Sequence, residues 1–227
     1  EIASHANGHF NGLHWSESQW IDELNLFNNL VFHAQENNPQ ISLPKINLNE
    51  KDIVGFRAPE LAKNQDTHKA MKALGYLYDA SGIDMGKKWP EKDATGLWML
   101  PLASINIPGL GETISIDYSI FSLESGAKDT VKADSPMWHF LRKNTLESYE
   151  NYFNRNYNGN RAPVFIANHF SKWNDSLYWE VMKKFAYDTC GKIDVYCVTY
   201  KDLANYLDSL PQAELQKLQE SKIHSLN

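Results

Sequence analysis

The sequence predicts an α/β protein that folds as a single domain. Short apolar runs rich in β-branched and aromatic residues alternate with longer segments in which apolar residues recur at helical spacing. Hydrophobic residues make up 42% of the 227 residues and aromatic residues 12%, which is enough for a substantial core. No internal repeat or low-complexity linker divides the chain, so we expect one domain over residues 1–227.

Five segments are predicted to be strands. Several of them are apolar without alternation, which is typical of strands that helices cover on both faces. They are IVGFRAP (53–59), YLYDAS (76–81), LWMLPL (97–102), PVFIANH (163–169) and DVYCVTY (194–200).

Four segments have the apolar spacing of amphipathic helices. The first starts at an S-x-x-Q capping box formed by Ser16 and Gln19 and continues to about residue 35. The others cover 67–74, 138–152 and 178–185, the last of them after the capping cluster Asn174, Asp175 and Ser176. The stretch 103–136 is rich in turn residues, and we expect it to be a long loop region.

The charge and the two cysteines exclude some classes of protein. A net charge of -6 without a basic stripe argues against a nucleic-acid partner, and no apolar run is long enough to predict a membrane span. Cys190 and Cys197 are seven residues apart, which is the wrong spacing for a CxxC redox motif, and two cysteines are too few for a structural zinc site. They form either a local disulfide or two buried free thiols.

His5 and His9 form an H-x-x-x-H motif near the start of the chain. On a helical turn this spacing lets both imidazoles reach one metal ion. The residue after the first histidine is Ala6 and not the glutamate of H-E-x-x-H metallopeptidases, so that class is excluded. Two surface or helix-capping histidines are the alternative interpretation.

Arg57 and His169 each lie at the end of a predicted apolar strand. An unpaired guanidinium at the edge of a core is costly, so Arg57 is expected to have a carboxylate partner. In a β/α barrel, strand-end residues gather on one face, where catalytic groups are found. We therefore expect Arg57, His169 and the histidine pair to converge there.

Six segments occur in order along nearly the whole chain: EIASHANGH, GFRAPEL, GYLYDAS, LWMLPL, FIANHF and DVYCVTYKDLANYL. In this order they resemble the polysaccharide deacetylase family, the NodB-homology carbohydrate esterases, and within it the chitin deacetylase branch. The resemblance implies a distorted (β/α) barrel of about seven strands. It also implies a hydrolase that uses zinc or another divalent metal to remove N-acetyl groups from an N-acetylglucosamine-containing glycan such as chitin.

The resemblance also implies roles for individual residues. His5 and His9 would bind the metal, and Arg57 would orient a carboxylate base. The backbone N–H near Glu60 would stabilise the oxyanion, and His169 would be the general acid. In the same way, Ile166 would line the pocket for the acetyl methyl group.

One family motif has no match in this sequence. It is a strand ending in two aspartates, which supply the base and the third metal ligand, and it precedes the H-x-x-x-H motif in the family. We expect this first strand upstream of Glu1, so that the chain is N-terminally incomplete. A complete gene without it would contradict the enzyme hypothesis.

Other residues are candidates for contacts around the site. A protonated His169 needs a carboxylate neighbour, and Asp79 and Asp84 are candidates; Asp79 is also expected near the substrate. Trp89, Trp98 and Trp173 are expected to stack on sugar rings, with core packing as the alternative.

Two other functions stay open at this stage. The chain could be a carbohydrate-binding pseudo-deacetylase that lacks the base, or its substrate could be peptidoglycan. A scaffold barrel whose histidines only cap helices is a third interpretation. The glycan substrate class leads us to expect a periplasmic or extracellular protein, and we expect a monomer.

Overall fold

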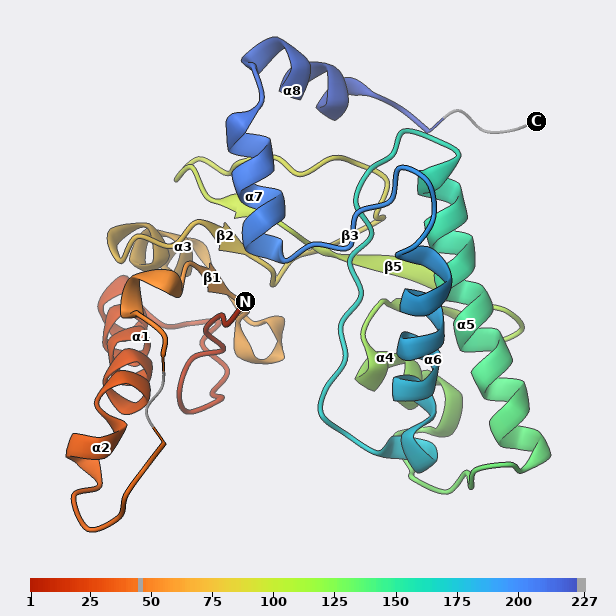
Figure 1. Cartoon of the computed structure of the whole chain (residues 1–227), viewed down its shortest axis with the longest axis horizontal. Helices are drawn as coiled ribbons and strands as arrows, with labels where there is room; N and C mark the ends of the chain where they lie inside the picture. The colour runs from red at the N-terminus through yellow and green to blue at the C-terminus, as the bar shows by residue number, and fades with distance from the viewer. Residues whose placement is uncertain (45–46, 224–227) are drawn as a thin grey trace. The chain divides into compact units, whose positions relative to one another are not determined.

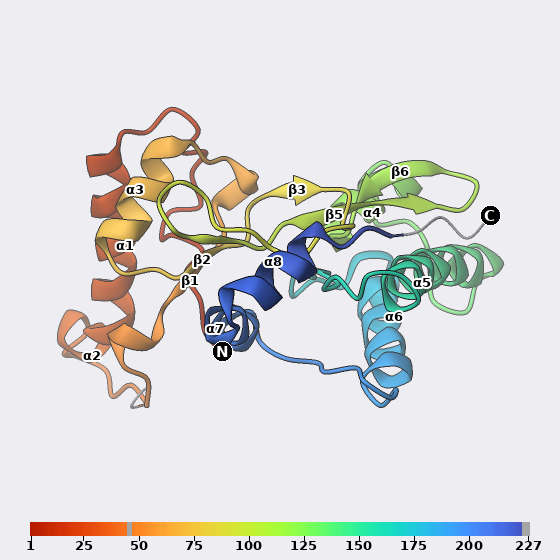
Figure 2. The same ribbon diagram turned by 90° about the horizontal axis from the view of Figure 1, so that it is seen from above.

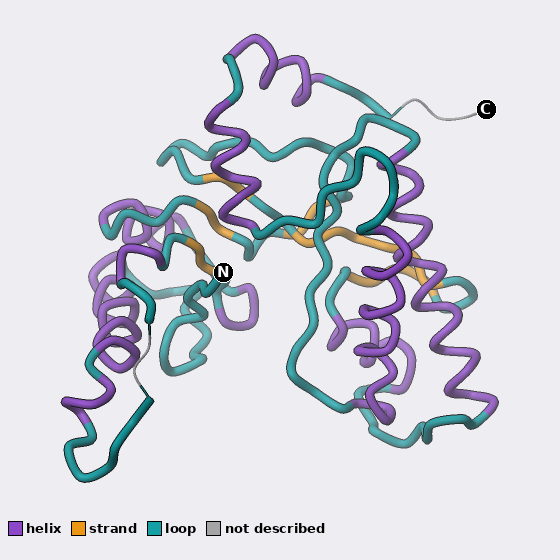
Figure 3. Tube along the Cα trace, in the orientation of Figure 1, coloured by secondary structure: helices purple, strands orange, loops and turns teal. Residues whose placement is uncertain are grey.

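The computed structural model describes residues 1–44 and 47–223 and confirms the α/β class, because the described residues contain both helices and short strands that pair into small sheets (Figures 1 and 3). The described residues contain six strands in two three-stranded sheets, where the resemblance implied a barrel of about seven. The chain divides into two compact units, which we describe separately. The first unit comprises Glu1–Gly82, Glu91–Leu100 and Thr199–Leu210, and the second comprises Ile83–Pro90, Pro101–Val198 and Pro211–Asn227.

The sheet of the first unit is parallel, in the order β1-β2-β4. Its strands are β1 (Gly55–Phe56), β2 (Tyr78–Asp79) and β4 (Trp98–Met99). The N-terminal segment extends it through a parallel bridge between Ser4 and Phe56. Parallel strands end at the same edge of a sheet, so the residues that follow Ser4, Phe56 and Tyr78 lie near one another.

Local sequence signals explain the helices of the first unit. The capping box of Ser16 and Gln19 is present at the start of α1 (Glu17–Phe32), as predicted, and Asn64 and Thr67 form one at α3 (Gln65–Ala73). Trp20 and Leu24 of α1 are fully buried, and the ring of Trp20 packs edge-on against Phe56, with centroids 5.7 Å apart. Helices α1 and α3 pack side by side (Figures 1 and 2). The remaining helices are α2 (Ala34–Asn37), η1 (Glu50–Asp52), η2 (Pro59–Leu61) and α7 (Tyr200–Ser209).

The sheet of the second unit has the order β3-β5-β6 and lies partly in the stretch expected to be a loop. Strand β3 (Ile83–Asp84) is parallel to β5 (Leu102–Ile107), and β6 (Gly111–Ile114) is antiparallel to β5. The turn residues that suggested a loop form the tight hairpin between β5 and β6, where Gly109 and Gly111 adopt positive φ angles of 77° and 113°.

Two strand predictions fail in the described residues. The segment 163–169 contributes only a parallel bridge between Ile116 and Ala167. The segment 194–200 is irregular up to Val198, and Tyr200 begins α7. Apolar β-branched composition is a weak guide here, because pairing depends on neighbours that are distant in sequence.

Helices α5 (Pro136–Tyr157) and α6 (Trp173–Thr189) pack side by side in the second unit (Figures 1 and 2). They contain the predicted helical segments 138–152 and 178–185. Helix α5 also packs on β5. Their buried side chains include Leu141, Tyr149 and Val181, which meet Ile105 and Ile107 of β5 in one core. The unit also contains α4 (Asp117–Ser125) and α8 (Gln212–Glu220).

Cys190 and Cys197 form a disulfide, with Cα atoms 5.5 Å apart, so the first of the two alternatives for these cysteines is correct. The bridge closes the loop that follows α6. Within residues 1–44 and 47–223, no helix combines the length and the apolar character needed to cross a membrane.

Candidate functional site

His5 and His9 lie close together, with ring centroids 5.0 Å apart and ring planes at 75°. The bridge between Ser4 and Phe56 places His5 next to Arg57, and Nδ1 of His5 is 2.7 Å from the backbone oxygen of Arg57. The structure therefore brings together two of the residues that sequence analysis placed at strand ends, His5 and Arg57.

The turn that separates the two histidines is not helical. Ala6 and His9 have left-handed φ angles of 58° and 50°. The backbone N–H groups of Asn7 and Gly8 donate to the same carboxylate oxygen of Glu23, at 2.8 and 2.5 Å. The histidines meet because a left-handed turn is anchored to α1, and not through the one-turn helical spacing considered from the sequence.

The two imidazoles fit the role of metal ligands. A carbonyl oxygen can only accept a hydrogen bond, so Nδ1 of His5 carries the proton and Nε2 carries the lone pair of the neutral ring. Metal-binding histidines are oriented in this way by a backbone carbonyl. Within the described part of the chain, no group of three or more His, Cys, Asp and Glu side chains has the arrangement of a metal site. Metal binding by His5 and His9 therefore stays a prediction.

Arg57 is held by a carbonyl and an aromatic ring. Its Nε donates to the backbone oxygen of Ala80 at 3.0 Å, and its Nη2 donates to the hydroxyl of Tyr200 at 3.2 Å. The guanidinium also lies 5.9 Å from the centre of the Tyr200 ring, which stacks on Tyr78. Among the described residues Arg57 has no carboxylate partner, contrary to the sequence expectation, because these groups hold it instead.

Glu60 lies in the turn η2 and has a left-handed φ of 55°, an unusual conformation for a residue with a side chain. Its exposed carboxylate accepts a hydrogen bond from Nδ2 of Asn11 at 2.7 Å. Asn11 follows the histidine turn in sequence, so this contact ties that loop to the turn containing Glu60. Sequence analysis identified neither Asn11 nor Glu23, since no local pattern marks a contact between distant segments.

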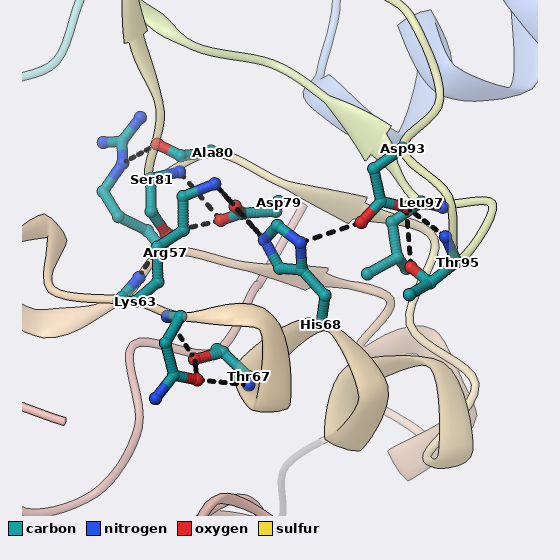
Figure 4. A network of polar contacts seen from close by, with 12 residues as sticks. Arg57, Lys63, Thr67, His68, Asp79, Ala80, Ser81, Asp93, Thr95 and Leu97 are labelled. Carbon is teal, nitrogen blue, oxygen red and sulfur yellow. Dashed lines mark hydrogen bonds and ion pairs between the residues drawn. The ribbon is translucent and has the colours of Figure 1, made fainter. Parts of the chain in front are cut away.

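Asp79 is 1% exposed and belongs to a buried ionic network (Figure 4). Its Oδ2 accepts from Lys63 Nζ at 2.6 Å and faces Nε2 of His68 at 3.0 Å, while Oδ1 accepts from the backbone N–H and the hydroxyl of Ser81. The other ring nitrogen of His68 is 2.8 Å from Asp93.

This network explains the acidity of Asp79 and argues against its expected roles. Burial by itself raises the pKa of Asp79, but hydrogen bonds from His68 and Lys63 outweigh it and lower the pKa to about 2. Its carboxylate is enclosed by these partners, which disfavours both direct substrate contact and pairing with the late histidine. Asp84, the other candidate, accepts from the backbone N–H of Gly86 at 2.6 Å.

In the second unit, the carboxylate beside His169 is Asp117. Nδ1 of His169 is 2.6 Å from Oδ1 of Asp117, and the backbone N–H of His169 donates to Oδ2 at 2.8 Å. Asp117 is fully buried, whereas the His169 side chain is 47% exposed. The bridge between Ile116 and Ala167 aligns the two segments. Sequence analysis missed Asp117 because the stretch around it was interpreted as a loop.

The predicted aromatic residues differ in accessibility. The Trp173 ring lies 5.5 Å from the His169 ring and stacks on Phe121, so it flanks the exposed imidazole. Trp89 is half-buried and donates from its indole to the Asn160 carbonyl at 2.9 Å. Trp98 is 1% exposed and donates to Asp208, which argues against its stacking on a sugar.

Ile166 is half-buried and packs against the core of the second unit. It lies three residues before His169, at the position where an apolar side chain was expected from the family pattern. Its contact with an acetyl group stays a prediction.

No family model matches the chain, and no curated protein does. Among solved structures, the chain is similar to a putative polysaccharide deacetylase from Mycobacterium smegmatis. The TM-score is 0.50 and the sequence identity 18%, over 100% of this chain and 67% of that chain. At this identity, the similarity concerns the fold.

Proposed function

We propose that the chain carries out metal-dependent hydrolytic N-deacetylation of a glycan that contains N-acetylglucosamine, with chitin or chitin oligosaccharides as the first choice of substrate. The observation that carries the proposal is the histidine pair, in which the Arg57 carbonyl sets the tautomer of His5 that a metal requires. The fold similarity to a putative polysaccharide deacetylase supports it. We also propose that the chain belongs to the chitin deacetylase branch of that family and has the distorted (β/α) barrel fold that the resemblance implies.

The proposed roles of the residues follow the family resemblance. His5 and His9 would hold the metal, which when bound polarises the acetamide carbonyl and activates water. The backbone N–H of Glu60 would donate to the oxygen that gains charge as the carbonyl is attacked. Water oxygen bonds to the acetyl carbon, the C–N bond breaks, and acetate and the free amine are released.

His169 would give a proton to the departing amine nitrogen. A carboxylate beside an imidazole favours the protonated form that this step needs, and buried Asp117 occupies that position. Trp173 beside His169 would stack on a sugar ring of the substrate. The base would be an aspartate of the Asp-Asp motif that the family resemblance implies.

The direct test is zinc-dependent release of acetate from chitin oligosaccharides. We would assay this chain and the polypeptide of its complete gene, each with zinc and with a chelator, and compare peptidoglycan fragments as substrate. Release that depends on zinc and is lost in His169→Ala supports the proposal. A folded, zinc-loaded product of the complete gene that releases no acetate from any of these glycans contradicts it.

A second candidate function is glycan binding without hydrolysis. It is favoured by the ring of Trp173 beside the exposed His169, since a flat aromatic ring can stack on a sugar face. That function predicts retention on a chitin resin with no acetate release. We further propose that the protein is an exported monomer. The disulfide supports export, since disulfides persist in oxidising compartments.

A further inference from the structure

Glu23 connects helix α1 to the turn between the two histidines. One oxygen of its carboxylate accepts from two consecutive backbone N–H groups, those of Asn7 and Gly8, at 2.8 and 2.5 Å. These are two of the three residues that separate His5 from His9. A carboxylate bonded in this way forms charge-assisted hydrogen bonds, which are stronger than neutral ones.

The turn depends on this support because its backbone is unfavourable by itself. Ala6 and His9 both adopt left-handed φ angles, and residues with a side chain rarely do so unless their surroundings impose it. The two N–H groups bonded to Glu23 lie between these left-handed residues. Removing their acceptor would let the turn relax and change the separation of the two imidazoles.

Glu23 itself is held by the packing of α1. The next residue, Leu24, is fully buried, and so is Trp20 one turn earlier. Trp20 packs against Phe56, the residue that bridges to Ser4 and so positions His5. The histidine pair is therefore restrained from two directions, by the sheet at His5 and by the helix at the turn.

We propose that Glu23 is a positioning residue that holds the turn of residues 6–9 and so sets the affinity of the histidine pair for a divalent metal ion. The inference rests on the proposed function, because it assumes that His5 and His9 bind the metal. The inference goes beyond the proposed function because Glu23 lies in α1, outside the H-x-x-x-H motif, and supports the proposed metal ligands from there.

The test compares Glu23→Ala and Glu23→Gln with Asp22→Ala, a matched control at the neighbouring, exposed acidic position of the same helix. Zinc affinity is measured by calorimetry on the full chain. Hydrogen exchange of the Asn7 and Gly8 amides and the ring resonances of His5 and His9 are measured by NMR without metal. Thermal unfolding shows whether each variant is folded.

We expect Glu23→Ala to weaken zinc binding by about 10-fold or more, the usual effect of losing a group that supports metal ligands. Exchange of the Asn7 and Gly8 amides should accelerate, and the histidine ring resonances should shift. Glu23→Gln keeps an acceptor oxygen without the charge, so this variant should lose less zinc affinity than Glu23→Ala. Asp22→Ala should match the wild type in all measurements.

The outcomes separate this inference from the proposed function. Unchanged zinc affinity in folded Glu23→Ala overturns the inference and leaves the proposed function standing. Zinc binding that depends on Glu23, in a complete protein that releases no acetate, supports the inference and refutes the deacetylase. If Glu23→Ala does not fold, the same measurements are made on Glu23→Gln. The inference is overturned if that variant binds zinc as tightly as the wild type and its Asn7 and Gly8 amides exchange at the wild-type rate.

Discussion

The carboxylate of Asp117 binds His169 at two points, accepting from the backbone N–H with one oxygen and facing Nδ1 of the ring with the other at 2.6 Å. Because the backbone and the side chain of His169 are held by one buried group, the imidazole has little freedom to rotate. The proposed proton transfer would then take place at Nε2. Under the proposed function, this relationship gives Asp117 the role of orienting the proposed general acid.

Asp117→Asn should lower kcat for acetate release by about 100-fold, with a much smaller effect on KM, since general acid catalysis contributes about 10²–10⁴-fold. The amide cannot stabilise the imidazolium as a carboxylate does. Steady-state kinetics on chitin oligosaccharides would measure the effect. Asp84→Asn is the control, and a larger loss in that variant would show that the late histidine has a different partner.

Lys63→Met should destabilise the first unit by about 1–3 kcal/mol, because it removes a cation from the buried carboxylate of Asp79. Lys69→Met removes an exposed ion pair with Asp66 and should change the stability much less, because solvent screens such a pair. Urea unfolding of both variants gives the comparison. Equal stability of the two variants would mean that the network in Figure 4 does not stabilise the fold.

Glu124 should make the second unit less stable as the pH rises. Burial raises its pKa to about 7, although hydrogen bonds from Thr145 and Tyr178 oppose the shift. Because the pKa of Glu124 in the folded state is higher than its ordinary value of 4.5, the folded state binds the proton more tightly than the unfolded state. The resulting stabilisation of the fold is complete below pH 4.5 and is lost as the pH rises through about 7.

We expect this loss to be on the order of 2–3 kcal/mol, measured by urea unfolding between pH 4.5 and 8. The glutamine of Glu124→Gln cannot titrate. The difference between the free energies of unfolding of this variant and of the wild type should therefore change between pH 4.5 and 8. A difference that is constant with pH would contradict the prediction.

Loss of the disulfide should destabilise the second unit by about 2 kcal/mol, the value expected for a short closed loop. The double variant Cys190→Ser with Cys197→Ser and the reduced wild type should unfold at the same, lower temperature. Zinc binding should not change, because the histidine pair belongs to the first unit. A wild-type midpoint that is insensitive to reductant would show that the bridge adds no stability.

The four predicted helices are present because their signals are local, whereas α4, α7 and α8 were not predicted. The capping box at Ser16 and the apolar stripe behind it lie within a few turns of chain and produce α1 nearly as expected. The hairpin of β5 and β6 was mistaken for a loop, because glycines and prolines mark a turn without showing that the flanking segments pair. The predicted strand at 194–200 failed for the related reason that pairing requires a distant partner.

The sequence by itself determined the α/β class, the main helices and the order of the candidate residues His5, His9, Arg57 and His169, because these depend on composition and short-range pattern. Only the tertiary structure decided what surrounds them. Asp117 beside His169, Glu23 beneath the histidine turn and the burial of Trp98 depend on segments that are distant along the chain. Such contacts form when the sheets pair and the cores pack, and no local spacing encodes them.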